Sequence, residues 1–299
     1  MRLRPWVVVF LVSLAAVPVA SFLSRSPDSP GTSGHASAAE TESWRAQRER
    51  DLKSDTGWLT VAGLAFLAPG VNSIGSDRNS DVVLPHPAPA QAGELTRQDR
   101  RVWFTPAAGS GILLNGAPVV EKIQLKPRDR LAFGGVTFHL HESGERVGIR
   151  IRDVNSPLRR SFRGLQWFPV REAWTIDATF VPYDRPRVTT VANVLGDYEQ
   201  LTIPGEVVFQ VNGQEVRLQA AQAGKRLWLI FSDATAPRET YRIRFLYADA
   251  PSAEGRVRLD FNRAYNPPCA YNPFTTCPVP PPQNRLKIAI PAGERIPHP

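Results

Sequence analysis

The sequence predicts an all-β protein with two β-sandwich-like domains, preceded by one helix and ending in an irregular, proline-rich segment. Turn signals recur along the chain. Asn-Gly or Gly-Gly pairs separate apolar runs at 115–116, 134–135 and 212–213, and such pairs are typical of tight β-hairpins. The 28 prolines and 21 glycines are spread without a period over 299 residues. This pattern favours short strands and many turns over collagen or repeat architectures.

The start of the chain has the pattern of an export signal. Arg2 and Arg4 precede an apolar stretch from Trp6 to Ala20, and small residues follow. A positive end, a short apolar middle and a small-residue region are the features of a secretory signal. The stretch is also shorter than the roughly 20 residues that a spanning helix needs. We expect residues 1–23 to be a signal peptide or, alternatively, an uncleaved membrane anchor, with the rest periplasmic or extracellular.

A linker and a helix are predicted next. Residues 24–41 are mostly Ser, Pro, Gly and Ala without an apolar period, which predicts a flexible linker. Charges at helical spacing, with Trp44 and Leu52 as apolar positions, then predict a helix over Glu42–Lys53, inside a segment that spans 42–56.

Short apolar runs follow, and we divide them into two domains. The first β domain is expected over residues 57–152 and the second over 165–295, with a connecting helical turn over 153–164. Ser156 and Pro157 predict the start of that turn, because serine caps helices and proline suits the first helical position. Strands of the second domain are expected at Trp174–Phe180, Glu206–Val211, Leu227–Phe231, Thr240–Leu246 and Val257–Phe261.

The net charge of +8 suits acidic partners such as phosphates, anionic glycans or a membrane surface, or serves solubility alone. Arginines gather at 97–101 and 152–163, but no aromatic residues alternate with them as in a nucleic-acid stacking surface. We therefore expect no nucleic-acid partner.

Three stretches of the chain are distinctive: GWLTVAGLAFLAPGVNSIGSD (57–77), RDVNSPLRRSFRGLQWFPV (152–170) and LDFNRAYNPPCAYNPFTTCPVPPPQNRL (259–286). Together they resemble domain-of-unknown-function family 1684. The resemblance extends from about residue 44 to residue 294. It implies a family without a settled activity.

Residues 60–140 are similar to a forkhead-associated sandwich, whose working members bind phosphothreonine through an Arg-Ser/Arg-His loop. The equivalent stretch here, PAPAQAGEL (87–95), contains no arginine, serine or histidine. The resemblance thus implies the β-sandwich of this family without the loop residues that bind the phosphopeptide. Protein or phosphopeptide docking through this domain, with cationic residues near Arg78 and Arg97, stays an alternative.

No familiar catalytic motif occurs. The chain lacks the G-x-S-x-G, H-E-x-x-H, P-loop and dinucleotide patterns, so we expect no cofactor. His139 and His141 alternate on a predicted strand and point the same way, but a metal site needs a third ligand. We expect a solvent-facing pair and no metal.

Cys269 and Cys277 are the two cysteines of the chain. In an exported protein they predict a disulfide, worth about 2.5 kcal/mol on the chain-entropy estimate, and neighbouring prolines reduce this gain. A metal pair and a catalytic thiol are the alternatives.

Polar residues are dense around this cysteine loop. Arginines among apolar residues need carboxylates, carbonyls or a ligand. They can pair with Asp233, Asp260 and Glu294 and fasten the C-terminal segment, or line a site for a small anionic or sugar-like ligand. The candidate ligand-binding residues are Tyr241, Arg244, Asp260, Asn262, Arg263, Tyr265, Asn266, Asn284 and Arg285.

The sequence therefore favours an exported binding or envelope-associated module over an enzyme. A hydrolase that uses Asp260, Tyr265 or Asp233 as acid or base in the same pocket remains the alternative.

Overall fold

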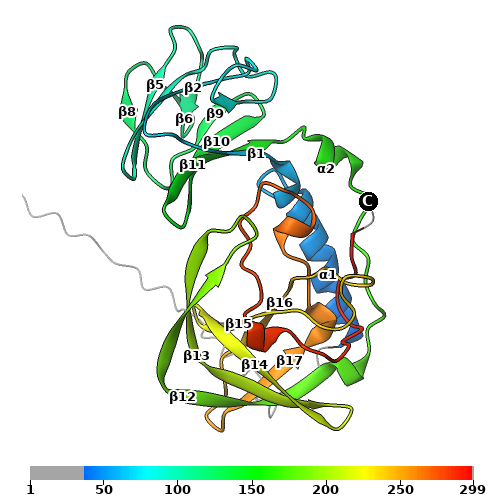
Figure 1. Ribbon diagram of the computed structural model, residues 1–299. Helices are drawn as coiled ribbons and strands as arrows, with labels where there is room; N and C mark the ends of the chain where they lie inside the picture. Colours follow the sequence, from blue (N-terminus) through cyan, green and yellow to red (C-terminus); the bar gives the residue numbers. More distant parts are fainter. Residues whose placement is uncertain (1–36, 298–299) are drawn as a thin grey trace, which may run out of the picture. The chain divides into compact units, whose positions relative to one another are not determined.

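The computed structural model describes residues 37–297 (Figure 1). The predicted signal segment (1–23) and most of the predicted linker lie outside this range. The described chain is mostly β, with strands arranged in three sheets. None of its helices combines the length and apolar character needed to cross a membrane.

Helix α1 (Ala38–Lys53) begins four residues before the predicted start at Glu42. The Ser37 hydroxyl accepts from the Glu40 amide at 3.1 Å, and the Glu40 carboxylate accepts from the Ser37 amide at 2.8 Å. This reciprocal capping box satisfies two free amides and fixes the helix start. Residues 38–41, expected in the linker, are therefore helical.

The first β domain contains two sheets. One has the order β1-β11-β10-β9-β6-β7 and the other β3-β2-β4-β5-β8. Their apolar faces share one core, in which the rings of Phe104 and Phe138 meet edge to face at 6.3 Å. The strands are β1 (Val61–Phe66), β2 (Gly70–Gly75), β3 (Val82–Val83), β4 (Gly93–Gln98), β5 (Arg101–Pro106), β6 (Leu113–Leu114), β7 (Ala117–Pro118), β8 (Ile123–Gln124), β9 (Leu131–Phe133), β10 (Val136–Ser143) and β11 (Arg146–Asp153).

The predicted hairpins form where the turn pairs occur. Asn115 and Gly116 join β6 to β7 with φ values of 51° and 90°, and Asn212 and Gly213 join β13 to β14 with 51° and 76°. Two consecutive positive φ values match the twist of an antiparallel hairpin. The helical turn α2 (Pro157–Ser161) is also confirmed: the Ser156 hydroxyl accepts from the Arg159 amide at 3.1 Å.

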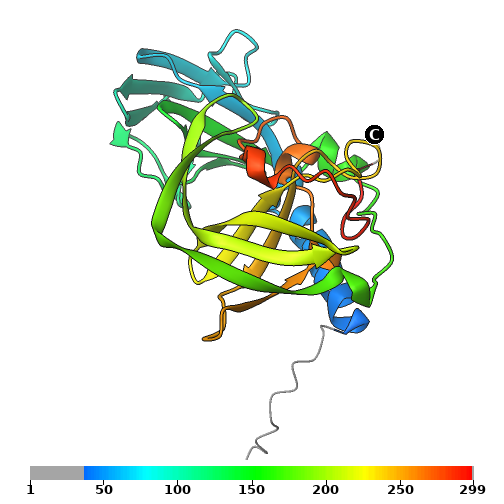
Figure 2. The ribbon, with the colours of Figure 1, turned by 60° about the horizontal axis from the view of Figure 1, so that its bottom comes forward.

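The second β domain is one sheet with the order β16-β15-β14-β13-β12-β17. The sheet curls into a near-barrel (Figure 2). Its core contains buried side chains such as Leu218, Leu229 and Phe231. A 3-10 turn at Glu172–Trp174 precedes it. The strands are β12 (Thr175–Ala192), β13 (Tyr198–Val211), β14 (Gln214–Ala223), β15 (Arg226–Phe231), β16 (Arg244–Asp249) and β17 (Arg256–Asp260).

Several of these strands differ from the predicted ones. β12 and β13 are far longer than expected, because the register shifts between Pro182 and Arg187 and the pairing then resumes up to Ala192. β16 begins at Arg244 rather than at Thr240. β17 ends at Asp260, one residue before the predicted end at Phe261, because a 3-10 turn over Phe261–Arg263 follows it.

The seam of the near-barrel lies between β16 and β17, which are neighbours in space. Just after β17, Tyr265 exchanges two backbone hydrogen bonds with Phe245 of β16, each 2.9 Å long. The chain continues as an irregular segment with 3-10 turns at Pro268–Ala270 and Pro282–Asn284. The expected proline-rich C-terminal segment is thus present, and it covers the seam.

Candidate functional site

Arg244, a predicted ligand-binding residue, is fully buried beneath the C-terminal segment, with a side-chain exposure of 0%. Its guanidinium pairs with the Asp233 carboxylate and donates to the carbonyls of Ile290, at 3.0 Å, and Ala292. Burial lowers the pKa of Arg244, and the neighbouring Asp233 charge works in the opposite direction. This cation holds the end of the chain against the sheet.

The three predicted asparagines are buried and bonded to the protein. The Asn262 amide accepts from the Arg171 backbone N–H at 3.0 Å and donates to its carbonyl at 2.9 Å. Asn284 does the same to Gln219, at 2.8 and 2.9 Å. Asn266 donates to the Glu294 carboxylate at 3.0 Å. A buried side-chain amide that pairs with a backbone group replaces a missing strand contact.

The remaining candidates, apart from Tyr265, also have partners within the protein. Arg263 forms an ion pair with Asp260 at 3.2 Å, and Arg285 donates to the Pro280 carbonyl at 3.2 Å. The Tyr241 hydroxyl donates to the Cys269 carbonyl at 3.1 Å, and burial raises the pKa of Tyr241 to about 12. These contacts correspond to the first of the two interpretations, in which the polar residues fasten the C-terminal segment. Of the nine candidates, Tyr265 lines the groove described next.

This groove, the α1 groove, consists of two adjoining hollows of 490 Å³ and 330 Å³. Both are lined by Arg48, Leu52, Trp58, Tyr247 and Tyr265. Helix α1 forms one wall because its lining residues recur at helical spacing and therefore lie on one face. These α1 residues are Trp44, Gln47, Arg48, Asp51 and Leu52. The inner hollow is completed by Phe245, Pro268 and residues 275–278.

Aromatic rings form the opposite wall of the α1 groove. Tyr247 stacks on Tyr265 at 6.4 Å and on Trp228 at 6.0 Å. Burial raises the pKa of both Tyr247 and Tyr265. The two phenols therefore stay protonated at neutral pH and keep their hydrogen-bonding capacity.

Arg48 is the one cationic side chain that lines the groove. Its guanidinium lies 4.2 Å from the centre of the Tyr265 ring, bonds the buried Glu294 carboxylate at 2.8 Å, and donates to the Asn266 carbonyl at 2.7 Å. Burial raises the pKa of Glu294, whereas the Arg48 charge lowers it. Because Arg48 already has a carboxylate partner, the groove offers little free positive charge.

Two predictions are wrong: the disulfide between the cysteines and the solvent-facing pair of histidines. The predicted disulfide is not formed: Cys269 and Cys277 are free thiols, and the Cys269 amide donates to Cys277 Sγ at 3.3 Å. His139 and His141 are half-buried rather than solvent-facing. Arg150 contacts His141 Nε2 at 3.1 Å, and Thr276 Oγ1 lies 3.4 Å from the same atom. Between residues 37 and 297, no group of three or more His, Cys, Asp or Glu side chains is arranged to hold a metal.

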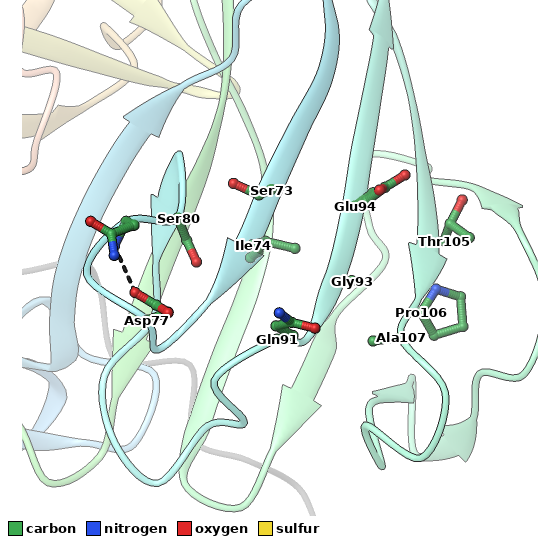
Figure 3. Close-up of a pocket in the computed structure, with 11 residues that line it drawn as sticks. Ser73, Ile74, Asp77, Ser80, Gln91, Gly93, Glu94, Thr105, Pro106 and Ala107 are labelled. Atoms are coloured by element: carbon green, nitrogen blue, oxygen red, sulfur yellow. Dashed lines mark hydrogen bonds between the residues drawn. The ribbon is translucent and has the colours of Figure 1, made fainter.

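The first β domain has a separate pocket of 550 Å³ between the loop after β2 and the ends of β4 and β5 (Figure 3). Its charged lining residues are Asp77 and Glu94. Arg97 does not line it, and donates to the carbonyls of Leu67 and Asp99 instead. An acidic lining repels phosphate, so this pocket does not match the phosphopeptide alternative.

With this geometry established, family comparison assigns the second β domain. Residues 160–295 match a family described as a protein of unknown function, DUF1684. This segment is a DUF1684 domain. The match starts at residue 160, later than the resemblance from about residue 44 had indicated, so α1 lies outside it. No curated protein matches the chain. The α1 groove is thus formed by the DUF1684 domain together with residues that precede it.

Three solved structures are similar to parts of the chain. An uncharacterized protein of Haloarcula marismortui, solved by NMR, is 28% identical over 46% of this chain and 78% of that one, with a TM-score of 0.39. An FHA domain studied for phosphothreonine-dependent interactions is 20% identical over 30% of this chain and 92% of its own, with a TM-score of 0.23. The FHA domain of Rv0020c is 19% identical over 30% and 94%, with a TM-score of 0.22. The likeness to FHA domains is distant, and we transfer no binding property from it.

Proposed function

We propose that the DUF1684 domain and α1 form a binding module, and that the α1 groove holds a ring of a neutral, sugar-like ligand. One observation carries the proposal: the groove combines aromatic faces on one wall with polar side chains on the other. Tyr247, Tyr265 and Trp58 supply the rings. Gln47 and Asp51, which are hydrogen-bonded to each other at 2.7 Å, are part of the polar wall.

This combination suits a sugar for chemical reasons. One face of a pyranose presents C–H groups that pack on an aromatic ring, while its rim carries hydroxyls that bond carboxylates, amides and phenols. The volumes of 490 and 330 Å³ are in the range of small-molecule sites. The anionic alternative has weaker support, because Arg48, the arginine among the groove's lining residues, is already paired with Glu294. Arg150 contacts the Trp58 ring but does not line either hollow.

Replacing Tyr247 by Ala tests the proposal. Loss of one stacking face is expected to weaken binding about tenfold, or about 1.4 kcal/mol. Tyr198→Ala is the matched control, because Tyr198 lies on β13 with 66% of its surface exposed. Binding is measured by calorimetric titration with a panel of neutral and sulfated mono- and oligosaccharides. The proposal is wrong if none of the neutral sugars binds or if both variants weaken binding equally. Binding of the sulfated sugars alone would favour the anionic alternative.

We also propose that the module is exported, and that its N-terminal segment tethers it to the membrane or is cleaved. The charged and apolar pattern of residues 1–23 supports this. A fusion of residues 1–41 to a reporter that is active only outside the cytoplasm should be active, and replacing Arg2 and Arg4 by Glu should reduce its export.

A further inference from the structure

Cys277 occupies a specific place at the inner end of the α1 groove. It lines the 330 Å³ hollow together with Thr276 and Pro278, although its exposed fraction is only 6%. Cys269 is more exposed than Cys277 but does not line this hollow, and its carbonyl accepts from the Tyr241 hydroxyl at 3.1 Å. Of the two cysteines, Cys277 is therefore the one that a molecule in the groove meets.

The two cysteines are held in contact without being joined. The Cys269 amide donates to Cys277 Sγ at 3.3 Å. Thr275 Oγ1 lies 3.8 Å from Cys277 Sγ. Cys277 thus sits among hydrogen-bonding groups that can stabilise a negative charge on its sulfur.

A buried arginine beside Cys277 adds positive charge. Arg150 is 7% exposed, and its Nε has no hydrogen-bond partner. Its guanidinium contacts the neutral ring of His141 and lies 5.3 Å from the centre of the Trp58 ring. Over residues 37–297 it forms no ion pair with a carboxylate, which is costly for a buried cation. A thiolate at Cys277 would supply the missing negative charge nearby, because His141, which Arg150 contacts, also lies 3.4 Å from Thr276, the residue before Cys277.

We propose that Cys277 and Cys269 are a dithiol–disulfide exchange pair that reacts with low-molecular-weight disulfides entering through the α1 groove. The Cys277 thiolate attacks one sulfur of the small disulfide. That S–S bond breaks, the first small thiolate leaves and takes up a proton, and a mixed disulfide remains on Cys277. Cys269 then loses its proton and attacks the Cys277 sulfur. The second small thiolate leaves and is protonated, and the two electrons of the protein dithiol have reduced the small disulfide.

The two thiols have environments that fit these separate roles. The hydrogen bond from Cys269 and the positive charge of Arg150 lower the pKa of Cys277, against the opposing effect of burial. The hydrogen bond to Cys277 and burial raise the pKa of Cys269. Because the thiolate is the attacking species, Cys277 begins the exchange and Cys269 completes it. The inference is independent of saccharide binding.

Hydroxyethyl disulfide, a small neutral reagent, is the probe. The Cys269→Ser variant should accumulate a mixed disulfide on Cys277, seen by intact mass, whereas Cys277→Ser should stay unmodified under the same conditions. The full chain should instead lose two hydrogens as its internal disulfide forms. In mixtures of the probe and its thiol, the two protein forms should interconvert reversibly without unfolding.

Arg150→Met in the Cys269→Ser background tests the positioning role of the arginine. Losing this nearby charge raises the pKa of Cys277, and the greater nucleophilicity of the more basic thiolate offsets part of the loss of thiolate. Mixed-disulfide formation near neutral pH is therefore expected to be about threefold slower. Arg152→Met is the matched control, because Arg152 also contacts Trp58 and lies on the same strand.

Three outcomes would overturn the inference. The first is that Cys277 stays unmodified in Cys269→Ser while the protein remains folded. The second is that both arginine variants slow the reaction equally. The third is that the internal disulfide forms but resists reduction by the small thiol in the folded state, which would make it a structural cross-link. None of these results bears on sugar binding, because the saccharide titration uses Tyr247→Ala with both cysteines unchanged.

Discussion

Replacing Arg244 by Leu is expected to lower the free energy of unfolding by about 3–5 kcal/mol. The substitution leaves the Asp233 carboxylate buried without its cation, and it removes the donor to the carbonyls of Ile290 and Ala292. Urea denaturation followed by tryptophan fluorescence measures the change. The loss should be largest here because both side chains of the pair are fully buried.

Arg263→Leu is the matched control for this prediction. Arg263 also pairs with an aspartate, Asp260, but 30% of its side chain is exposed, so we expect a loss of under about 1 kcal/mol. The double variant with both Arg244 and Asp233 replaced by Leu should recover part of the stability, because no uncompensated charge remains. Equal losses for Arg244→Leu and Arg263→Leu would contradict the role assigned to the buried pair.

Acid is expected to destabilise the first β domain through His139 and His141. Burial, and then the charges of nearby arginines, lower the pKa of His139 from 6.5 to about 4; burial and Arg150 do the same for His141. Between about pH 4 and pH 6.5, these two histidines bind protons in the unfolded chain but not in the folded chain. Stability is therefore unaffected by these groups above about pH 6.5, falls as the pH drops toward 4, and changes no further below that.

The size of this acid effect is moderated by partial exposure of both rings. After allowance for solvent screening, we expect about 1–2 kcal/mol for each histidine. Denaturation midpoints near pH 7 and near pH 4.5 should differ less in the variant with both histidines replaced by Gln than in the natural chain. His86→Gln, at an exposed position, is the control. The assignment is wrong if His86→Gln reduces the acid loss as much as the double variant does.

Local signals in the sequence were sufficient for much of the fold. The Asn-Gly hairpins at 115–116 and 212–213 were predictable, because a two-residue turn depends on its own backbone conformation. The start of α1 was also encoded locally, in the Ser37–Glu40 capping pattern, but the prediction used the spacing of charges instead. The lengths of β12 and β13 were not predictable in the same way, because they depend on a register shift between paired strands.

The candidate site could be predicted from the sequence only in part, because its residues come together through tertiary contacts. The density of polar residues near Cys269 pointed to Asn262, Asn266 and Asn284, yet these amides have partners inside the fold. Asn262 and Asn284 donate to backbone carbonyls, and Asn266 donates to the Glu294 carboxylate. The α1 groove combines segments that are far apart in sequence, including Trp44 and Tyr247. Its helical wall could have been found from the spacing of residues 44, 47, 48 and 51. The pairing of that face with the rings of β16 is a tertiary contact without a local signal.

The pairing of Tyr265 with Phe245 has a consequence for solubility. It occupies backbone groups at an outer strand that would otherwise be open to other molecules, and unprotected strands of this kind recruit further chains. The edge of β16 is therefore covered only after the chain has been synthesised as far as Tyr265. A product cut short before Tyr265 should therefore self-associate even if every preceding strand has formed.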